Sequence, residues 1–363
     1  MSLWMKVLAG VFALVVVLFV GFRVFQDRIM WSLFERGIQQ NLIGDPTADR
    51  PDGLHVYLCG TGSPMPDNLR AGPCIGVIAG EKAFVFDAGS GSIRKLGRMR
   101  FPFGDMDRAY LTHLHSDHID GLGELYLQAW VTGVESRSEP LPIYGPRGTA
   151  RVINAFNDAY TIDRGYRVAH HGVEHVNPAG FGGAPHEIVL PAGPTAALVV
   201  YDQDDITISA IRVNHAPIEP AFGYRIDYKD RSISISGDTI YSPGFVAASE
   251  GVDIMFHEAE DPEMGEKLAE GLISVGRELT AKLLIDTLNY HATPEDAARA
   301  AEDASAGELI YYHIVPPLPT AGLNSIWMGE ADEIYSGPIT VAEDGLLLTL
   351  PAGSDRIERT QVF

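Results

Sequence analysis

Cysteine is nearly absent from this chain of 363 residues, which contains only Cys59 and Cys74. Two cysteines exclude a framework of several disulfides, and they also exclude a cysteine-rich zinc site. Both lie on neighbouring apolar segments that are typical of adjacent strands. The sequence therefore leaves two alternatives open, a single bridge in an oxidising compartment or two buried free thiols.

Positive charge is also scarce, because 27 lysines and arginines stand against 48 aspartates and glutamates, which gives a formal net charge of −21. Nucleic-acid-binding proteins usually present a basic face to the phosphate backbone. We therefore do not expect nucleic acid to be a partner, unless a local basic patch exists. The 46% of hydrophobic residues is enough for a sizeable core.

The long apolar run from Val7 to Phe22 contains no charge and lies between Lys6 and Arg23. A helix of that length covers roughly 24 Å, slightly less than a bilayer core of about 30 Å, and the flanking side chains can reach the interfaces. A cleaved signal peptide is the alternative, but no small-x-small cleavage site follows the run. We predict a single-pass membrane anchor in residues 1–30.

After the anchor we predict a juxtamembrane segment and linker in residues 31–53 and one catalytic domain in residues 54–363. The charges on the two sides of the apolar run do not decide its orientation, since Lys6 is on one side and Arg23 and Arg28 are on the other. N-terminal anchors of this kind commonly hold a catalytic domain outside the cytoplasm. We therefore expect a periplasmic or otherwise extracytoplasmic domain.

Within the domain, strand-like and helix-like periods alternate, which predicts a mixed α/β fold with sheets inside and helices outside. Thr293-Pro294-Glu295-Asp296 is a typical helix start, with a hydroxyl cap and acidic residues in the first turn. The expected strands cover residues 55–59, 75–79, 83–86, 141–146, 205–213, 222–226, 231–236, 252–256 and 308–312, with a final hairpin of 339–341 and 345–350. The expected helices cover residues 122–130, 149–160 and about 262–288.

The densest chemical motif is Thr112 to Gly121, which follows the apolar end of a strand. It places three imidazoles and a carboxylate within six residues: His113, His115, Asp117 and His118. A strand that stops and turns sharply can direct the first two at one metal ion and the last two at a second. A surface loop that is histidine-rich by chance is the less convincing alternative.

Four other expected strands are each followed by a side chain that can bind metal or take part in catalysis: His215, Asp238, His257 and His313. The repetition indicates that one edge of the sheets contains the site. A further segment, residues 163–194, is rich in glycine, proline and histidine. It is either a loop that shapes the substrate site or a solvated loop in which His170, His171, His175 and His186 are merely scattered.

Together the motifs resemble the metallo-β-lactamase superfamily, in the branch of the ribonuclease Z phosphodiesterases and the zinc-dependent arylsulfatases. The resemblance covers about residues 54–350 and implies a four-layer αββα sandwich. It depends on the motifs Gly60–Ser63, Thr112–Gly121, His215 followed by Phe222–Ile226, Ser236–Thr239, His257–Ala259 and His313.

The resemblance implies a site for two Zn²⁺, with Mn²⁺ or Fe²⁺ as possible replacements. One ion is expected on His113, His115 and His215, and the other on Asp117, His118 and His313, with Asp238 bridging them. We expect Asp87 and Glu258 to hold ligands from behind rather than to bind metal. The candidate catalytic residues are Asp117, His257 and His291.

His291 aligns with a family histidine that donates a proton or hydrogen bond to the transition state, although Ala292 departs from the family pattern His-Ser-Ser-Thr. The implied reaction is attack by a metal-bridging hydroxide on a small anionic ester, either a sulfate ester or a phosphodiester. Only residues 227–236 separate two motifs between which ribonuclease Z usually has a long tRNA-binding arm.

Three alternatives remain: a tRNA 3′-end endoribonuclease, a lactonase or β-lactamase-type hydrolase, and a binding protein that has kept the fold but lost the chemistry. Family members are often dimers, which leaves a homodimer open.

Overall fold

The computed structural model describes residues 2–39 and 50–363, in two units, Met1–Arg50 and Pro51–Phe363. The first unit contains helix α1 (Leu3–Ile38), whose N-cap Ser2 accepts a hydrogen bond from the amide of Met5. It is long and apolar enough to cross a membrane, a test that a signal sequence also passes. The helix continues past residue 30, where we expected the anchor to end. Most of the expected linker, residues 40–49, lies outside the described part.

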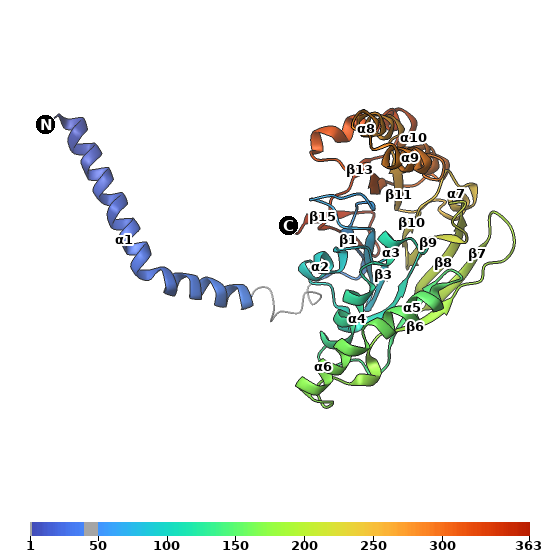
Figure 1. Ribbon diagram of the computed structural model, residues 1–363, viewed down its shortest axis with the longest axis horizontal. Helices are drawn as coiled ribbons and strands as arrows, with labels where there is room; N and C mark the ends of the chain where they lie inside the picture. Colours follow the sequence, from blue (N-terminus) through green and yellow to red (C-terminus); the bar gives the residue numbers. More distant parts are fainter. Residues whose placement is uncertain (1, 40–49) are drawn as a thin grey trace. The chain divides into compact units, whose positions relative to one another are not determined.

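The second unit contains two sheets that pack face to face between helices (Figure 1). The first sheet has the order β15-β14-β1-β2-β3-β4-β5-β6. Its strands are β1 (Gly53–Gly60), β2 (Cys74–Ala79), β3 (Lys82–Phe86), β4 (Met106–Tyr110), β5 (Leu141–Gly145), β6 (Gly183–Glu187), β14 (Leu346–Pro351) and β15 (Glu358–Gln361).

The second sheet has the order β13-β12-β11-β10-β9-β8-β7. Its strands are β7 (Ala197–Gln203), β8 (Ile206–Val213), β9 (Ala221–Tyr228), β10 (Arg231–Ile235), β11 (Ile254–Glu260), β12 (Leu309–Val315) and β13 (Ile339–Val341). The helices of this unit are α2 (Ser92–Arg98), α3 (Ser116–Ile119), α4 (Leu122–Val131), α5 (Thr149–Ala159), α6 (Thr161–His171), α7 (Pro243–Ala248), α8 (Pro262–Ser274), α9 (Glu278–Thr287), α10 (Pro294–Asp303), α11 (Asn324–Trp327) and α12 (Ala331–Ile334).

Side chains alternate between the two faces of each strand, and this alternation determines which layer they pack in. Along β1, Leu54, Val56 and Leu58 face the second sheet, while Tyr57 and Cys59 face the outer helices. Apolar residues of α2, α4 and α5 cover the outer face of the first sheet, and those of α7, α10, α11 and α12 cover the outer face of the second. This arrangement confirms the expected αββα sandwich.

Cys59 and Cys74 form a disulfide between β1 and β2, with a Cα–Cα distance of 5.1 Å. The bridge lies where the β1–β2 register shifts, at the pair of Gly60 with Cys74. Of the two alternatives that the sequence leaves open, the structure therefore has the bridge.

The expected final hairpin of residues 339–350 is wrong. Strand β13 pairs in parallel with β12 in the second sheet, whereas β14 pairs with β1 in the first. The connection between them is fixed by backbone hydrogen bonds from Ala342 to Tyr311 and from Gly345 to Leu58. Because these partners are remote in sequence, local pattern alone could not separate the two strands.

The segment of residues 163–194 is not simply a loop, because α6 and β6 contain much of it. Strand β7 was not expected at all. The helical stretch of residues 262–288 is two helices, α8 and α9, separated at Gly276, which has a φ of 75°. Thr293 does cap α10, since its side chain accepts a hydrogen bond from the amide of Asp296.

Candidate metal centre

The motif loop begins where β4 ends, and Asp87 holds it from the neighbouring strand. One oxygen of Asp87 accepts the amide of Thr112 at 2.8 Å, and the other accepts the hydroxyl of Thr112 at 2.8 Å and Nδ1 of His118 at 2.8 Å. Since Nδ1 donates to Asp87, Nε2 is the atom of His118 that is left to bind a cation. Asp87 thus lies behind His118, in the position of a residue that orients a ligand.

His215 follows β8, and its ring is fixed in the same manner by a backbone group. Its Nδ1 donates to the carbonyl oxygen of Tyr290 at 2.9 Å, so Nε2 again has the free lone pair. The Tyr290 ring also packs edge-on against His215, with centroids 4.9 Å apart. Sequence reasoning missed Tyr290, because a backbone carbonyl leaves no signal in residue type.

Asp238 follows β10 after a turn that requires glycine. Gly237 has a φ of 60°, and a Cβ there would lie 2.5 Å from the carbonyl oxygen of Phe222. The turn directs one carboxylate oxygen of Asp238 at four imidazoles. The distances from Oδ2 to Nε2 are 3.7 Å for His113, 3.3 Å for His118, 3.9 Å for His215 and 3.4 Å for His313.

Three overlapping groups of side chains result, and in each the potential ligand atoms lie within 4.8 Å of one another; the third group, Asp238, His291 and His313, joins the other two. We call the first two set one (His113, His115, His215 and Asp238) and set two (Asp117, His118 and His313). His313 lies within β12 rather than after it, with a φ of 48°, and its Nε2 is 3.3 Å from Oδ2 of Asp117. All seven side chains predicted as ligands are therefore brought together.

Several of these buried atoms have no hydrogen-bond partner among the described residues, namely Nε2 of His113, His118 and His215 and Oδ1 of Asp238. Buried polar atoms are normally paired, so a cluster of unpaired imidazole nitrogens and a carboxylate oxygen has the donor set of a cation site. Imidazole and carboxylate donors suit zinc, and also manganese or iron. The residues thus fit divalent cations at this centre.

The two sets differ in protonation. In set one, burial lowers the pKa of His113 well below its ordinary value, and it also lowers the pKa of His115 and His215. In set two, burial opposes the charged form, but the carboxylates, with Asp238 first, raise the pKa of His118 and His313. Set one is therefore neutral, whereas set two retains protons that a cation would displace.

The shared carboxylate is ionised. Burial alone would raise the pKa of Asp238, but the imidazoles of His313 and His118 hold it well below its usual range. The pKa of Asp117 is lowered in the same way against its own burial. Both carboxylates can therefore bind a cation without first losing a proton.

His291 lies beside the two sets, after α9. Its ring stacks on His313 at 5.6 Å and meets His215 edge-on at 5.2 Å. Its Nδ1 is 2.9 Å from Oε1 of Glu258, an oxygen that also accepts the amides of Thr239 and Ala292. Burial disfavours the imidazolium, but Glu258 outweighs it and raises the pKa of His291 to about 9.

His257 is not brought to this centre. Strand β11 continues through Glu260, so His257 and Glu258 point to opposite faces. The Nδ1 atom of His257 is 2.7 Å from the carbonyl oxygen of Glu258, and its ring lies edge-on to Phe245 in the helix-covered layer. The structure thus separates His257, which we predicted as a catalytic residue, from Glu258, which we predicted behind the ligands and which contacts His291.

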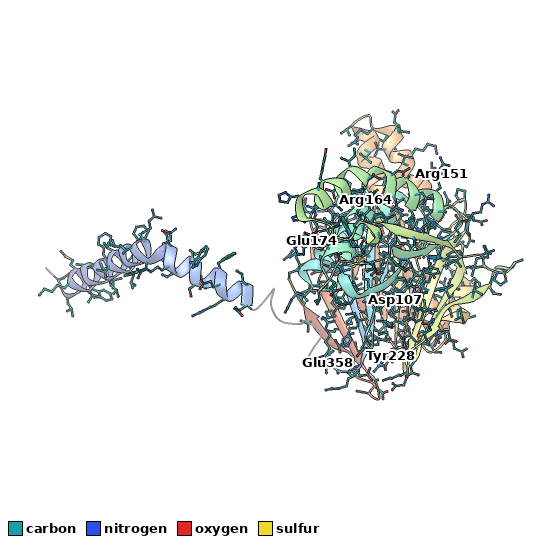
Figure 2. The ribbon with its side chains drawn as sticks, turned by 90° about the horizontal axis from the view of Figure 1, so that it is seen from below. Asp107, Arg151, Arg164, Glu174, Tyr228 and Glu358 are labelled. Atoms are coloured by element: carbon teal, nitrogen blue, oxygen red, sulfur yellow. A yellow bond between two sulfur atoms is a disulfide. The ribbon has the colours of Figure 1, made fainter. Side chains whose placement is uncertain are left out.

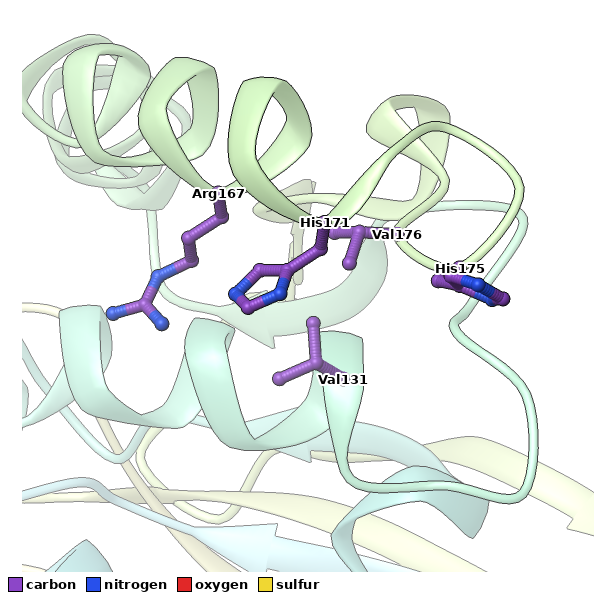
Figure 3. A pocket seen from close by; sticks show the side chains of 5 residues that line it. All are labelled: Val131, Arg167, His171, His175 and Val176. Carbon is purple, nitrogen blue, oxygen red and sulfur yellow. The ribbon is translucent and has the colours of Figure 1, made fainter.

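The four histidines of the 163–194 segment lie elsewhere. His186 stacks on Tyr144 at 4.5 Å. His171 and His175 line a pocket of about 390 Å³ between α4 and α6 with Val131, Arg167 and Val176 (Figure 3). None of the four belongs to the ligand groups found among the described residues.

Known proteins are similar to this chain over most of its length. A family model described as "Beta-lactamase superfamily domain" matches residues 82–314. A ribonuclease Z of Mycobacterium bovis (strain BCG / Pasteur 1173P2) is 33% identical over 292 residues, which cover 80% of this chain and 96% of the relative. A ribonuclease Z of Mycobacterium avium (strain 104) is 32% identical over 291 residues, with the same coverage.

Solved structures are similar in fold. The short form of human tRNase Z matches with a TM-score of 0.58 and 22% identity, over 82% of this chain and 99% of that one. A metallo-β-lactamase fold protein from Bacillus subtilis matches with a TM-score of 0.55 and 21% identity, over 82% and 99%. At these identities the two structures support the fold alone.

Proposed function

Because the chain belongs to the metallo-β-lactamase superfamily, in the ribonuclease Z branch, we propose that it is a metal-dependent hydrolase of RNA phosphodiester bonds. The observation behind this proposal is the match to ribonuclease Z along almost the full length of that relative, together with the family model over residues 82–314, which contain both ligand sets. It favours the phosphodiesterase over the arylsulfatase. It also runs against our expectation that nucleic acid is not a partner.

Divalent cations held by the two sets would supply Lewis acid chemistry at phosphorus and a water of lowered pKa. The chain's own residues do the rest. Asp238 and Asp117 place two negative charges beside the cations, which the charge of two divalent cations would still exceed, so the centre would attract an anionic phosphodiester. His291, kept protonated by Glu258, can give the proton at its other ring nitrogen to the leaving oxygen.

A small phosphodiester is the second candidate, and the β9–β10 connection favours it. Strand β9 ends at Tyr228 and β10 begins at Arg231, so the turn has no room for a long arm. The net charge of −21 also weakens attraction of a long polyanion. A sulfate ester would need the same centre, and nothing in the geometry favours it.

The test is a parallel assay of the zinc-loaded full chain on precursor tRNA, unstructured RNA, an aryl phosphodiester and an aryl sulfate. Asp238→Ala serves as the inactive control. We expect cleavage of RNA and of the phosphodiester, lost in the variant. Turnover of the aryl sulfate or the aryl phosphodiester without any RNA cleavage would contradict the proposal.

We further propose that α1 anchors the chain in a membrane, with its hydrolase unit in an oxidising compartment. Its length and apolar composition and the Cys59–Cys74 disulfide support this location. Carbonate extraction of membranes, together with protease protection of the hydrolase unit, checks it. Release of the protein by carbonate, or an N-terminus that begins after α1, would contradict the anchor.

A further inference from the structure

An acidic hydrolase of RNA needs a local surface that binds phosphate, and one short stretch of the sequence is exceptional in its charge. Residues 94–100 contain four cationic side chains, Arg94, Lys95, Arg98 and Arg100, and no acidic one. The next densest stretch of seven residues, 225–231, contains three cations interrupted by two aspartates. The first stretch covers most of α2 and the turn that follows it.

Helix α2 starts directly behind the metal centre. The amide of Ala88 donates to the carbonyl oxygen of His118 at 2.8 Å. A Cβ on Gly89 would lie 2.3 Å from the carbonyl oxygen of Asp117, so the two backbones are in close contact. The hydroxyl of Ser92, at the start of α2, donates back to Gly89 at 2.7 Å. The position of α2 is therefore fixed relative to two metal ligands.

The cations of α2 divide into an inner one and two outer ones. Lys95 forms a 2.6 Å ion pair with the buried Asp344, which also accepts the amides of Thr61 and Ala71. That lysine is therefore committed to holding the loop before β2. Arg94 and Arg98 are four residues apart on one helix face and point outward.

Both outer arginines are exposed to solvent. The Arg94 side chain is 81% exposed and forms an ion pair with the partly exposed Glu124 at the start of α4, at 2.5 Å. The Arg98 guanidinium lies 3.8 Å over the ring of Phe363. Arg98 also lines a cavity of about 320 Å³ with Arg70, Lys95, Glu343 and Asp344 among its other walls.

We propose that Arg94 and Arg98 bind backbone phosphates of an RNA strand whose scissile phosphodiester lies at the metal centre. This inference rests on the proposed function. Arg94 and Arg98 lie on the outward face of a helix whose start is in backbone contact with the loop of Asp117 and His118, so an RNA strand that leaves the centre on this side would meet both arginines. Their charge is local, which reconciles RNA binding with the strongly acidic chain.

The other arginine-containing surface, on α5 and α6, is a weaker match (Figure 2). Residues 147–175 contain four arginines but also three acidic residues, and Arg167 is bonded to Asp163 at 2.8 Å. The Arg164 guanidinium lies over Phe181. This surface provides the matched control, since Arg151 and Arg164 can be replaced without touching α2.

The experiment compares Arg94→Ala/Arg98→Ala with Arg151→Ala/Arg164→Ala in the zinc-loaded full chain in detergent. We expect the α2 variant to lose RNA cleavage, measured as kcat/KM, by about 10-fold or more at 200 mM salt, with unchanged turnover of an aryl phosphodiester. The slope of log affinity against log salt should become shallower by about 1.4, since each phosphate contact to a single strand contributes about 0.7. The control should match the parent.

Equal losses in both variants, or an unchanged salt slope in the α2 variant, would overturn the inference. Binding of a fluorescent RNA by Asp238→Ala separates it from the proposed function, because binding needs no cleavage. If the parent chain cleaves no RNA, the proposed function is wrong. If RNA affinity is the same with and without the α2 substitutions, the inference is wrong as well. Binding of short-chain phosphatidylserine micelles that requires the two arginines, with unchanged RNA affinity, would assign the surface to a membrane and overturn the proposal.

Discussion

The two ligand sets are neighbours that share Asp238, yet the chain supports them differently. Behind set one lie neutral groups, namely the carbonyl of Tyr290 on His215 and the hydroxyl of Thr112, which is 3.1 Å from Nδ1 of His113 and 3.3 Å from Nδ1 of His118. Behind set two lies a carboxylate, Asp87 on His118. A carboxylate makes an imidazole a stronger base and a better metal ligand than a neutral acceptor does.

The difference means that the two cation sites should respond differently to pH. The imidazoles of set one are neutral and ready to bind, because burial lowers their pKa. Those of set two hold protons, because carboxylates raise their pKa, and a cation must displace these protons. Set two should thus lose its cation first as pH falls, although its ligands are the stronger bases.

The largest effect is expected where the sets meet. Asp238→Ala removes the one carboxylate that both sets share, so the zinc bound after desalting should fall for both sites. Activity should fall by on the order of 1000-fold or more, since bound metal supplies several kcal/mol of transition-state stabilisation. Elemental analysis and the phosphodiester assay check this. Asp355→Ala, at an exposed carboxylate, is the control, and loss of zinc from one set only would show that Asp238 is not shared.

His291 touches both sets but should bind no cation of its own. His291→Ala should lower kcat by about 100-fold, within the range of general acid catalysis, and leave the zinc content unchanged. An acid must be protonated, so activity should fall as pH rises through about 9, the pKa that Glu258 gives His291. In Glu258→Gln that decline should move to lower pH, because the opposing charge is gone. A pH–rate profile that is identical in Glu258→Gln would exclude this role.

Asp87→Asn tests the asymmetry directly. Asparagine keeps an oxygen for Thr112 but not a second acceptor for Nδ1 of His118. We expect zinc affinity to fall by about 10- to 100-fold at one of the two sites, the usual effect of losing such a support. The complementary variant is His115→Ala, which touches set one alone. Competition with a chelating dye resolves the two sites, and equal weakening of both by Asp87→Asn would contradict the asymmetry.

The sequence predicted the ligands better than it predicted their surroundings. The spacing of His113, His115, Asp117 and His118 determines much of their geometry, because the four lie within six residues, on the loop after β4 and the first turn of α3. His215, Asp238 and His313 were found because a strand leads up to each of them. These patterns are local in the sequence, so they can be recognised without knowledge of the fold.

The features that the sequence did not predict depend on contacts between residues that are far apart in the chain. Glu258 and His257 are adjacent on β11 and lie on opposite faces of the sheet. Which of them faces the metal centre depends on how β11 pairs with β10 and β12. Tyr290 acts through its backbone. The last strands were assigned to one hairpin because no local sequence pattern shows that β13 pairs with β12 in the second sheet and β14 pairs with β1 in the first.

The smallest effect sharpens the contrast between carboxylates near the centre. Asp117 is ionised by its imidazoles, whereas burial raises the pKa of Glu260 to about 7, with only the hydroxyl of Thr287 bonded to it. A carboxyl with a raised folded pKa costs stability as pH rises from about 4.5 to about 7, where only the unfolded chain has lost the proton. Glu260→Gln should therefore stabilise the fold at pH 8 by about 1 to 3 kcal/mol and leave it nearly unchanged at pH 4.5. Urea unfolding at the two pH values measures this, and a gain of equal size at both would mean that folding does not raise the pKa of Glu260.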